Sequence, residues 1–167
     1  MMRNEPIRTG STVMPHAVRP ARATDLEFLV EGNARMAFET EHRELDRALL
    51  EEGVAAVLAD PHKGRYYVAD DGEGPVGQLL VTWEWSDWRC GWFWWIQSVY
   101  VVPDARGQGV FSLLYRHVLG AARRDPEVCG VRLYVEHDNA DAQAIYRHLG
   151  MREAGYRVLE DDFRRGA

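Results

Sequence analysis

The pattern of apolar residues changes along this chain, and the change outlines its helices and strands. In the first third they return every three or four residues, as on one face of a helix. This spacing predicts a helix over 45–59, which Asp60–Pro61 ends. An earlier helix is predicted toward Phe38, because Thr24 and Glu27 have the spacing of a capping box.

The middle of the chain is richer in β-branched and aromatic residues, and glycine-rich or polar turns interrupt it. These features are typical of strands. We therefore predict a short extended segment at 17–22 and strands at 65–70, 76–85 and 91–102.

Helical and extended segments then alternate to the end of the chain. The order is a helix at 110–122, a strand at 131–136, a helix at 139–149 closed by Gly150, and a last strand at 155–159. Two early helices, a strand meander and this alternation predict a mixed α/β fold built on one central sheet.

The size and composition agree with one domain. The chain has 167 residues, of which 46% are apolar, enough for a sizeable core. We place this domain at 16–167. Residues 1–15 are predicted to be a flexible leader, or an arm onto a partner subunit.

The charge and the cysteines limit the possible partners. The chain carries 26 acidic and 20 basic residues, a net charge of −6, which argues against a nucleic-acid backbone as its main partner. The tryptophan-rich stretch is too short to span a membrane, and the first residues lack the apolar core of a signal peptide, so a cytoplasmic protein is predicted. Cys90 and Cys129 are isolated, which favours free, buried thiols over a disulfide or a metal site.

One loop has the features of an anion site. In "PDARGQGVFSLLYRHV", residues 103–118, two glycines follow a strand and precede a helix. Backbone amides at a helix N-terminus favour an anion, and glycine lets a phosphate come close to the backbone. The loop lacks the P-loop ending and the dinucleotide fingerprint. By itself it is equally compatible with a plain strand–helix turn.

A second motif gives the loop its context. Asn139 begins the late helix, and Tyr146 lies two turns further on the same face. The run "SVYVVPDARGQGVFSLLYRHV" together with "VEHDNADAQAIYRHLGM" resembles the GCN5-related N-acetyltransferase (GNAT) family, and "VRPARATDLEFL" resembles the start of that fold. The resemblance covers nearly the whole chain from His16. It implies a mixed, mostly antiparallel central sheet, flanked by about four helices and splayed between the fourth and fifth strands.

The resemblance also implies residue roles in binding acetyl-CoA. Arg106 and Gly109 match the family's pyrophosphate motif, with Gly107 and Gln108 at the two positions between them, whereas Phe111 departs from it because the family has glycine or alanine there. A ring that large must turn away from the phosphates or reshape the pocket.

The predicted cofactor contacts come mostly from the backbone. The amides of Gln108, Gly109, Val110 and Phe111 would hold the diphosphate. Val99 and Val101 would pair with the pantetheine arm through their backbone. Asn139 would contact the cofactor arm, and it is also suited to be the N-cap of its helix.

The implied reaction is direct attack of an amine on acetyl-CoA in a ternary complex. Tyr146 matches the family's general acid, which protonates the leaving thiolate. Many relatives keep a glutamate where this chain has Gln97 or Ser98, neither of which is a base, so the proton of the amine would pass to a base elsewhere or to a chain of water molecules. Glu84 is the first candidate, and the others, each also compatible with a solvated surface position, are Asp87, Glu136, His137, Glu41 and His42.

Two regions bear on the acceptor. All six tryptophans lie between Trp83 and Trp95. They could stack across a hairpin in the core, form an acceptor wall through Trp85, Trp88 or Trp92, or form a homodimer interface. The helix–helix segment 38–46 contains Glu39, Glu41 and Glu44, which suit a cationic amine unless the segment is only a solvated loop.

The predicted function is therefore N-acetylation of a primary amine on a small, cationic metabolite, with acetyl-CoA as co-substrate and no metal. The alternatives are acetylation of a protein N-terminus or lysine, and a catalytically silent CoA-binding sensor. Gln97 and Phe111 keep the sensor alternative open.

Overall fold

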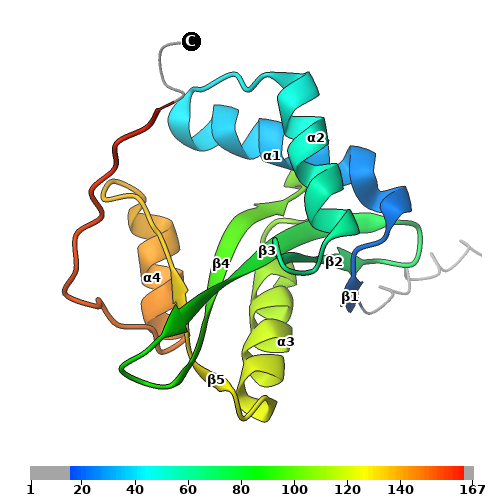
Figure 1. Cartoon of the computed structure of the whole chain (residues 1–167). Helices are drawn as coiled ribbons and strands as arrows, with labels where there is room; N and C mark the ends of the chain where they lie inside the picture. Colours follow the sequence, from blue (N-terminus) through cyan, green and yellow to red (C-terminus); the bar gives the residue numbers. More distant parts are fainter. Residues whose placement is uncertain (1–15, 164–167) are drawn as a thin grey trace, which may run out of the picture. The chain divides into compact units, whose positions relative to one another are not determined.

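The computed structural model describes residues 16–163, which fall into two compact units divided after Leu133 (Figure 1). The leader predicted at 1–15 lies outside the described residues. The prediction that 16–167 is one domain stays a prediction.

The first unit is built on a five-stranded sheet whose strands lie in sequence order. The strands are β1 (Ala17–Pro20), β2 (Arg65–Asp70), β3 (Pro75–Ser86), β4 (Gly91–Val101) and β5 (Val128–Leu133). Neighbours from β1 to β4 are antiparallel, and β5 runs parallel to β4. This confirms the predicted mixed, mostly antiparallel sheet.

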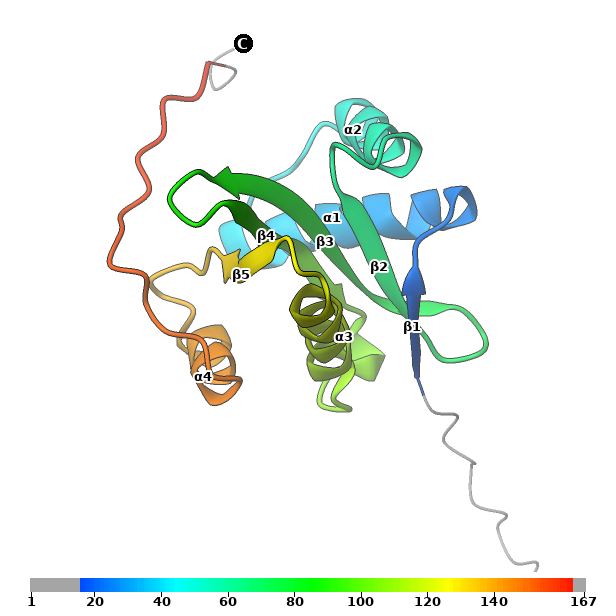
Figure 2. The same ribbon diagram turned by 60° about the horizontal axis from the view of Figure 1, so that its bottom comes forward.

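Three α-helices cover the two faces of this sheet. They are α1 (Leu26–Glu41), α2 (Arg47–Ala59) and α3 (Val110–Arg124), with short 3₁₀ turns η1 (Ala23–Asp25) and η2 (Pro103–Ala105) before α1 and α3. Figure 2 shows α3 on the face opposite α1 and α2. Two neighbouring tyrosines of β2 show the alternation: Tyr66 packs with Leu29 and Val54 of the helix pair, whereas the Tyr67 ring contacts His117 of α3.

A bulge in β4 shapes the open part of the sheet. Gln78 of β3 pairs with Tyr100 and Leu80 pairs with Gln97, so Ser98 and Val99 both oppose Leu79. Ser98 has a φ of 50°, in the left-handed region that a non-glycine residue seldom adopts. Pairing between β4 and β5 ends at Ile96, whereas β4 continues to Val101. The predicted splay between the fourth and fifth strands is therefore confirmed.

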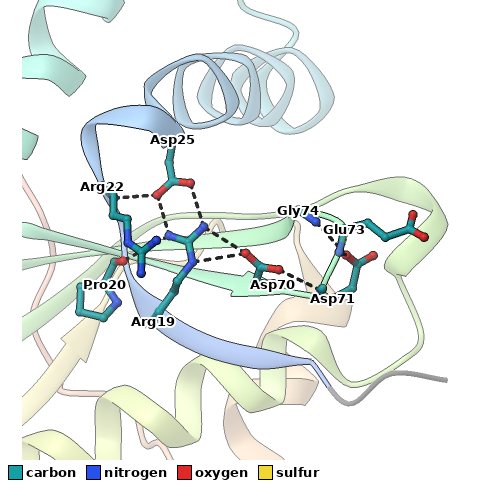
Figure 3. A network of polar contacts seen from close by, with 9 residues as sticks. Arg19, Pro20, Arg22, Asp25, Asp70, Asp71, Glu73 and Gly74 are labelled. Atoms are coloured by element: carbon teal, nitrogen blue, oxygen red, sulfur yellow. Dashed lines mark hydrogen bonds and ion pairs between the residues drawn. The ribbon is translucent and has the colours of Figure 1, made fainter. Parts of the chain in front are cut away.

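The start of α1 differs from the prediction. The Thr24–Glu27 capping box was wrong, because the chain first makes the turn η1, and the Asp25 carboxylate accepts a hydrogen bond from the Arg22 amide at 2.6 Å. Figure 3 shows that the Arg19 guanidinium of β1 lies between Asp25 and Asp70 of β2, at 2.7 and 3.1 Å. Arg19 holds the pKa of Asp25 below its usual value.

Two predicted strands also differ. The strand predicted at 131–136 is β5, which begins earlier because it pairs with β4 from Val128 onward. The strand predicted at 155–159 is wrong: in the second unit, residues 149–163 form no regular element. Gly155 has a φ of 76°, and the side chains of Val158 and Leu159 are exposed. A short segment without a strand partner does not form a stable strand.

The second unit contains α4 (Ala140–His148). Asn139 is its N-cap, and the side-chain oxygen accepts a hydrogen bond from the Ala142 amide at 3.0 Å. Gly150 follows the helix with a φ of 90°, as a C-terminal glycine does. The helix predicted at 139–149 and its capping by Asn139 are confirmed.

Candidate functional site

The glycine loop joins β4 to α3 and has a left-handed backbone at both glycines. Gly107 and Gly109 have φ values of 75° and 80°, which side chains strongly disfavour. A Cβ atom at either position would meet no other atom within 4 Å. The glycines are therefore required by backbone conformation, and the space beside them is open.

The start of α3 is suited to an anion. Gly109 is its N-cap and offers no side chain to cap the first amides, which also lack acceptors within the helix. The Gln108 side chain donates to the Asp104 carbonyl at 2.8 Å, so it is held back against the preceding turn. A diphosphate fits this loop, as the resemblance implied, and the contacts from Gln108 to Phe111 stay a prediction.

Phe111, the departure from the family motif, has a packing role. Its ring lies 6.0 Å, between centroids, from the ring of Tyr115, one turn further along α3. Tyr115 is buried, and burial raises the pKa of its hydroxyl. This contact accounts for a large side chain at the beginning of the helix.

Arg106 ties the loop to two other elements. Its Nε atom donates to the Val101 carbonyl at 2.9 Å, and its Nη2 atom lies 2.7 Å from the Glu39 carboxylate on α1. Its guanidinium carbon also lies 5.5 Å from the centroid of the Tyr100 ring. The one cationic side chain of the motif is therefore placed between the loop and α1.

The backbone of β4 beyond the bulge presents hydrogen-bonding groups to the open edge. Val102 donates to the Val76 carbonyl of β3 at 3.0 Å. Since alternate residues of a strand bond to opposite neighbours, the groups of Val101 point away from β3, where its carbonyl meets Arg106. Val99 lies in the bulge, where this alternation is interrupted. The orientation of Val101 fits the predicted pantetheine pairing, and the pairing of Val99 stays a prediction.

A hollow of about 310 Å³ lies on α1 beside this loop. It is lined by Ala34, Arg35, Phe38 and Glu39. The Phe38 ring is 56% exposed, and Glu39 is the partner of Arg106.

The acidic segment near the hollow is more helical than predicted. Helix α1 runs to Glu41, so Glu39 and Glu41 lie in its last turn, and only Glu44 lies in the connecting loop. His42 ends the helix with a φ of 51°, and its ring lies 6.5 Å from that of Phe38.

Glu84 lies in a network of its own. Its Oε1 atom lies 2.9 Å from Nη1 of Arg132, and its Oε2 atom accepts from the Trp95 indole nitrogen at 2.5 Å. The Arg132 guanidinium also stacks on the Phe93 ring at 3.7 Å. Both carboxylate oxygens of Glu84 already accept hydrogen bonds, and its role as base stays a prediction.

The other positions considered for the base are spread over the chain. The Gln97 amide donates to the Thr82 hydroxyl at 2.6 Å, so this position is structural and non-basic. The Asp87 carboxylate accepts from the Trp88 amide in the hairpin turn. Glu136 and His137 belong to the second unit, where their carbonyls accept from Gln143.

The tryptophans stack across the β3–β4 hairpin as predicted. Trp83 faces Trp94 and Trp85 faces Trp92, with ring centroids 5.3 and 5.0 Å apart. Trp94 is buried, but Trp88 at the turn is 86% exposed. Stacking is thus confirmed, and the acceptor wall and the homodimer interface stay predictions.

The predicted burial of Cys90 was wrong. Cys90 lies in the turn of the β3–β4 hairpin, and its side chain is exposed.

Tyr146 lies in α4, seven residues after the N-cap Asn139. It is half-buried, and its carbonyl accepts from the Met151 amide at 3.0 Å. Its role as general acid and the cofactor contact of Asn139 stay predictions.

Sequence reasoning missed two polar residues of the sheet, Gln78 and Arg132. A signal for the first was present, because Gln78 interrupts an apolar run in "VGQLLV". Arg132 gave no such signal, since its partner Glu84 is 48 residues away.

Within residues 16–163 no group of three or more histidine, cysteine or acidic side chains could hold a metal ion. Over the same residues, no helix has the length and apolar character needed to cross a membrane.

The sequence is similar to a known protein family and to a curated acetyltransferase. The sequence model of the Acetyltransferase (GNAT) family matches residues 26–151. The chain is 30% identical over 115 residues to the peptidyl-lysine N-acetyltransferase YjaB of Salmonella typhimurium, covering 69% of this chain and 67% of that protein.

Solved structures of other proteins share the fold of this chain. A possible acetyltransferase from Clostridium difficile has a TM-score of 0.84 and 41% identity, over 88% of this chain and 97% of that one. A predicted acetyltransferase from Clostridium acetobutylicum, solved with acetyl-CoA, shares the fold with a TM-score of 0.71 and 15% identity, over 88% of this chain and 96% of that one. The chain belongs to the GNAT family and is an acetyl-CoA-dependent N-acetyltransferase.

Proposed function

We propose that this enzyme acetylates the primary amine of a small, cationic molecule. The observation that supports the proposal is the hollow on α1, which the Phe38 ring and the Glu39 carboxylate line together with Ala34 and Arg35, and Glu39 also binds Arg106 of the glycine loop. An aromatic face and a carboxylate both attract an ammonium group. The net charge of −6 adds a general attraction for cations.

The proposed cofactor site uses the backbone more than side chains. The amides of Gln108, Gly109, Val110 and Phe111 hold the diphosphate, with support from the dipole of α3. The pantetheine arm lies along Val99 and Val101, and Asn139 contacts the same arm. Acetyl-CoA supplies the activated acetyl group, and the residues of the chain fix its place.

The proposed chemistry needs two proton transfers. The amine nitrogen forms the new bond to the acetyl carbon as the carbon–sulfur bond breaks. The Tyr146 hydroxyl gives a proton to the leaving sulfur. The amine loses a proton to Glu84 or to a water, and Glu84 then exchanges its bond to Arg132 or Trp95.

A second substrate class is favoured by one comparison. The Salmonella relative is a peptidyl-lysine N-acetyltransferase. A lysine side chain is itself an alkylammonium group, so the hollow on α1 also suits it. A protein N-terminus is a further primary amine of the same chemistry. The two free cysteines agree with the reducing cytoplasm, where we propose the enzyme acts.

Steady-state kinetics on matched amines test the proposal. Thiol release from acetyl-CoA is measured with a linear polyamine, an amino sugar, an uncharged-tail amine of equal length, and a lysine peptide. The proposal predicts the highest kcat/KM for a small amine with a second positive charge, and a fall in that preference as ionic strength rises. Equal kcat/KM for the charged and uncharged tails, or the highest value for the peptide, would contradict it.

A further inference from the structure

Gln78 is a polar residue in a place where stability favours an apolar one. Its side chain is fully buried, on the face of β3 that α1 covers. Its Oε1 atom has no hydrogen-bond partner among the described residues. A buried amide oxygen without a hydrogen-bond partner destabilises the fold. Stability alone therefore does not account for a glutamine here.

The other end of the same amide meets the β4 bulge. Its Nε2 atom donates to the Ser98 carbonyl over a long distance of 3.5 Å. Ser98 is the residue with the left-handed backbone, a conformation that persists only where neighbours hold it. Gln78 is thus the side chain of β3 that contacts the strained peptide.

A second side chain, that of Tyr66, contacts Ser98, and Asn33 in turn binds Tyr66. The Tyr66 hydroxyl of β2 interacts with the Ser98 side chain, and it accepts from the Asn33 amide of α1 at 3.0 Å. Burial raises the pKa of Tyr66, so this hydroxyl stays protonated. The bulge is therefore held through its carbonyl by Gln78 and through its side chain by Tyr66.

Helix α1 makes room for the Gln78 amide. A Cβ atom on Gly32 would lie 2.3 Å from Oε1 of Gln78, well inside van der Waals contact. Alanine would favour the helix, yet its methyl group would displace the amide. The absence of a side chain at Gly32 thus leaves the space that the Gln78 amide occupies.

We infer that Gln78 is a positioning residue for the cofactor: its amide fixes the Ser98 bulge, and the bulge sets the open backbone edge of Val99 and Val101. This inference rests on the proposed cofactor site. It assigns to Gln78 no contact with acetyl-CoA itself. The bulge begins two residues after the last pairing of β4 with β5, at the point where the edge becomes open.

The test replaces Gln78 with methionine, which is similar in length and apolar. The Kd of acetyl-CoA, measured by calorimetry, should rise at least about fivefold in Gln78→Met, as expected for one lost hydrogen bond. The Tm should stay unchanged or rise, because the unsatisfied oxygen is gone. Leu80→Met, on the same face of the same strand, is the control and should change neither value much.

Gly32→Ala provides an independent test through the helix. Its methyl group pushes on the same amide, so the Kd should rise while the added helix propensity supports the fold. A Kd equal to that of the wild type in both variants would overturn the inference, as would a lower Tm with an unchanged Kd. Failure of the wild-type protein to bind acetyl-CoA would instead overturn the proposed cofactor site, and the inference with it.

Discussion

The Arg106 guanidinium lies 2.7 Å from the Glu39 carboxylate, which joins the glycine loop to the last turn of α1. The two residues are 67 positions apart in the sequence. One end of this pair belongs to the predicted diphosphate loop and the other lines the hollow proposed for the amine. The pair therefore connects the two proposed substrate sites.

Replacement of Glu39 by glutamine should affect the two substrates in opposite directions. Free of its partner, Arg106 can turn to the diphosphate, so the Kd of acetyl-CoA should fall by about two- to fivefold at low salt and less at high salt. The KM of a cationic amine should rise, because the hollow loses its carboxylate. Calorimetry and steady-state kinetics measure the two effects.

Glu41→Gln is the matched control for this experiment. It removes the same charge from the same helical turn, and Glu41 is not among the residues that line the hollow. Equal effects of the two substitutions would mean that net charge, and not the Arg106 pair, decides binding.

A side chain at Gly109 should abolish tight cofactor binding. Gly109→Val forces a branched residue into a φ of 80°, which costs about 1–2 kcal/mol or more, and places methyl groups beside the amides that hold the diphosphate. We expect the Kd of acetyl-CoA to rise at least tenfold (about 1.4 kcal/mol). Tight binding by this variant would remove the loop from the cofactor site.

Gly53→Ala controls for a general effect of adding a methyl group to glycine. Gly53 is exposed within α2, and a Cβ atom there meets nothing within 4 Å. The free energy of unfolding should rise by about 0.5–1 kcal/mol, because alanine favours the helix. Acetyl-CoA binding should not change.

The Arg19–Asp25 pair should make stability depend on pH at the acid end. Because the folded-state pKa of Asp25 lies below its ordinary value of 3.8, its contribution is complete above that value and is lost as pH falls through the folded-state pKa. Asp25→Asn should lower the free energy of unfolding by about 1–3 kcal/mol at neutral pH. Denaturant unfolding at several pH values should show this difference shrinking below pH 3.8.

Glu73→Gln serves as the reference for that series. Glu73 is exposed in the β2–β3 turn, so its replacement should change stability by less than about 0.5 kcal/mol. A difference for Asp25→Asn that stayed constant down to the most acidic pH would show that the ionised carboxylate is not what stabilises the fold.

Tyr146→Phe should separate catalysis from binding. Loss of a general acid lowers kcat by about 10²–10⁴-fold, whereas the missing hydroxyl leaves acetyl-CoA affinity nearly intact. Tyr156→Phe, an exposed tyrosine in the same unit, should leave both values unchanged. An unaltered kcat in Tyr146→Phe would exclude this residue as the acid.

The sequence was sufficient where local patterns decide the structure. The helix 139–149 and its N-cap could be predicted because capping and periodicity involve neighbours in sequence. The strand at 155–159 could not be judged in this way, since a strand also requires a partner. The cap of α1 was missed for the same reason, because Arg19 of β1, which also binds Asp70 of β2, holds Asp25.

The residues of the candidate site also differ in whether local sequence patterns could predict them. The glycines of the loop could be identified from spacing and from the family resemblance. The partners of Glu84 and the contact of Gln78 with Ser98 could not, because they depend on strand register and on the β4 bulge. Such contacts join residues that are distant in sequence, and no local pattern encodes them.

The most direct measurement is the identity of the acetylated product when several acceptors compete. The enzyme and acetyl-CoA are incubated with equal concentrations of a linear polyamine, an amino sugar and a lysine peptide, and mass spectrometry identifies the product. Our account predicts a mono-acetylated small amine, formed with one thiol released per acetyl group. Acetylation confined to the peptide, or thiol release without any acetylated amine, would contradict it.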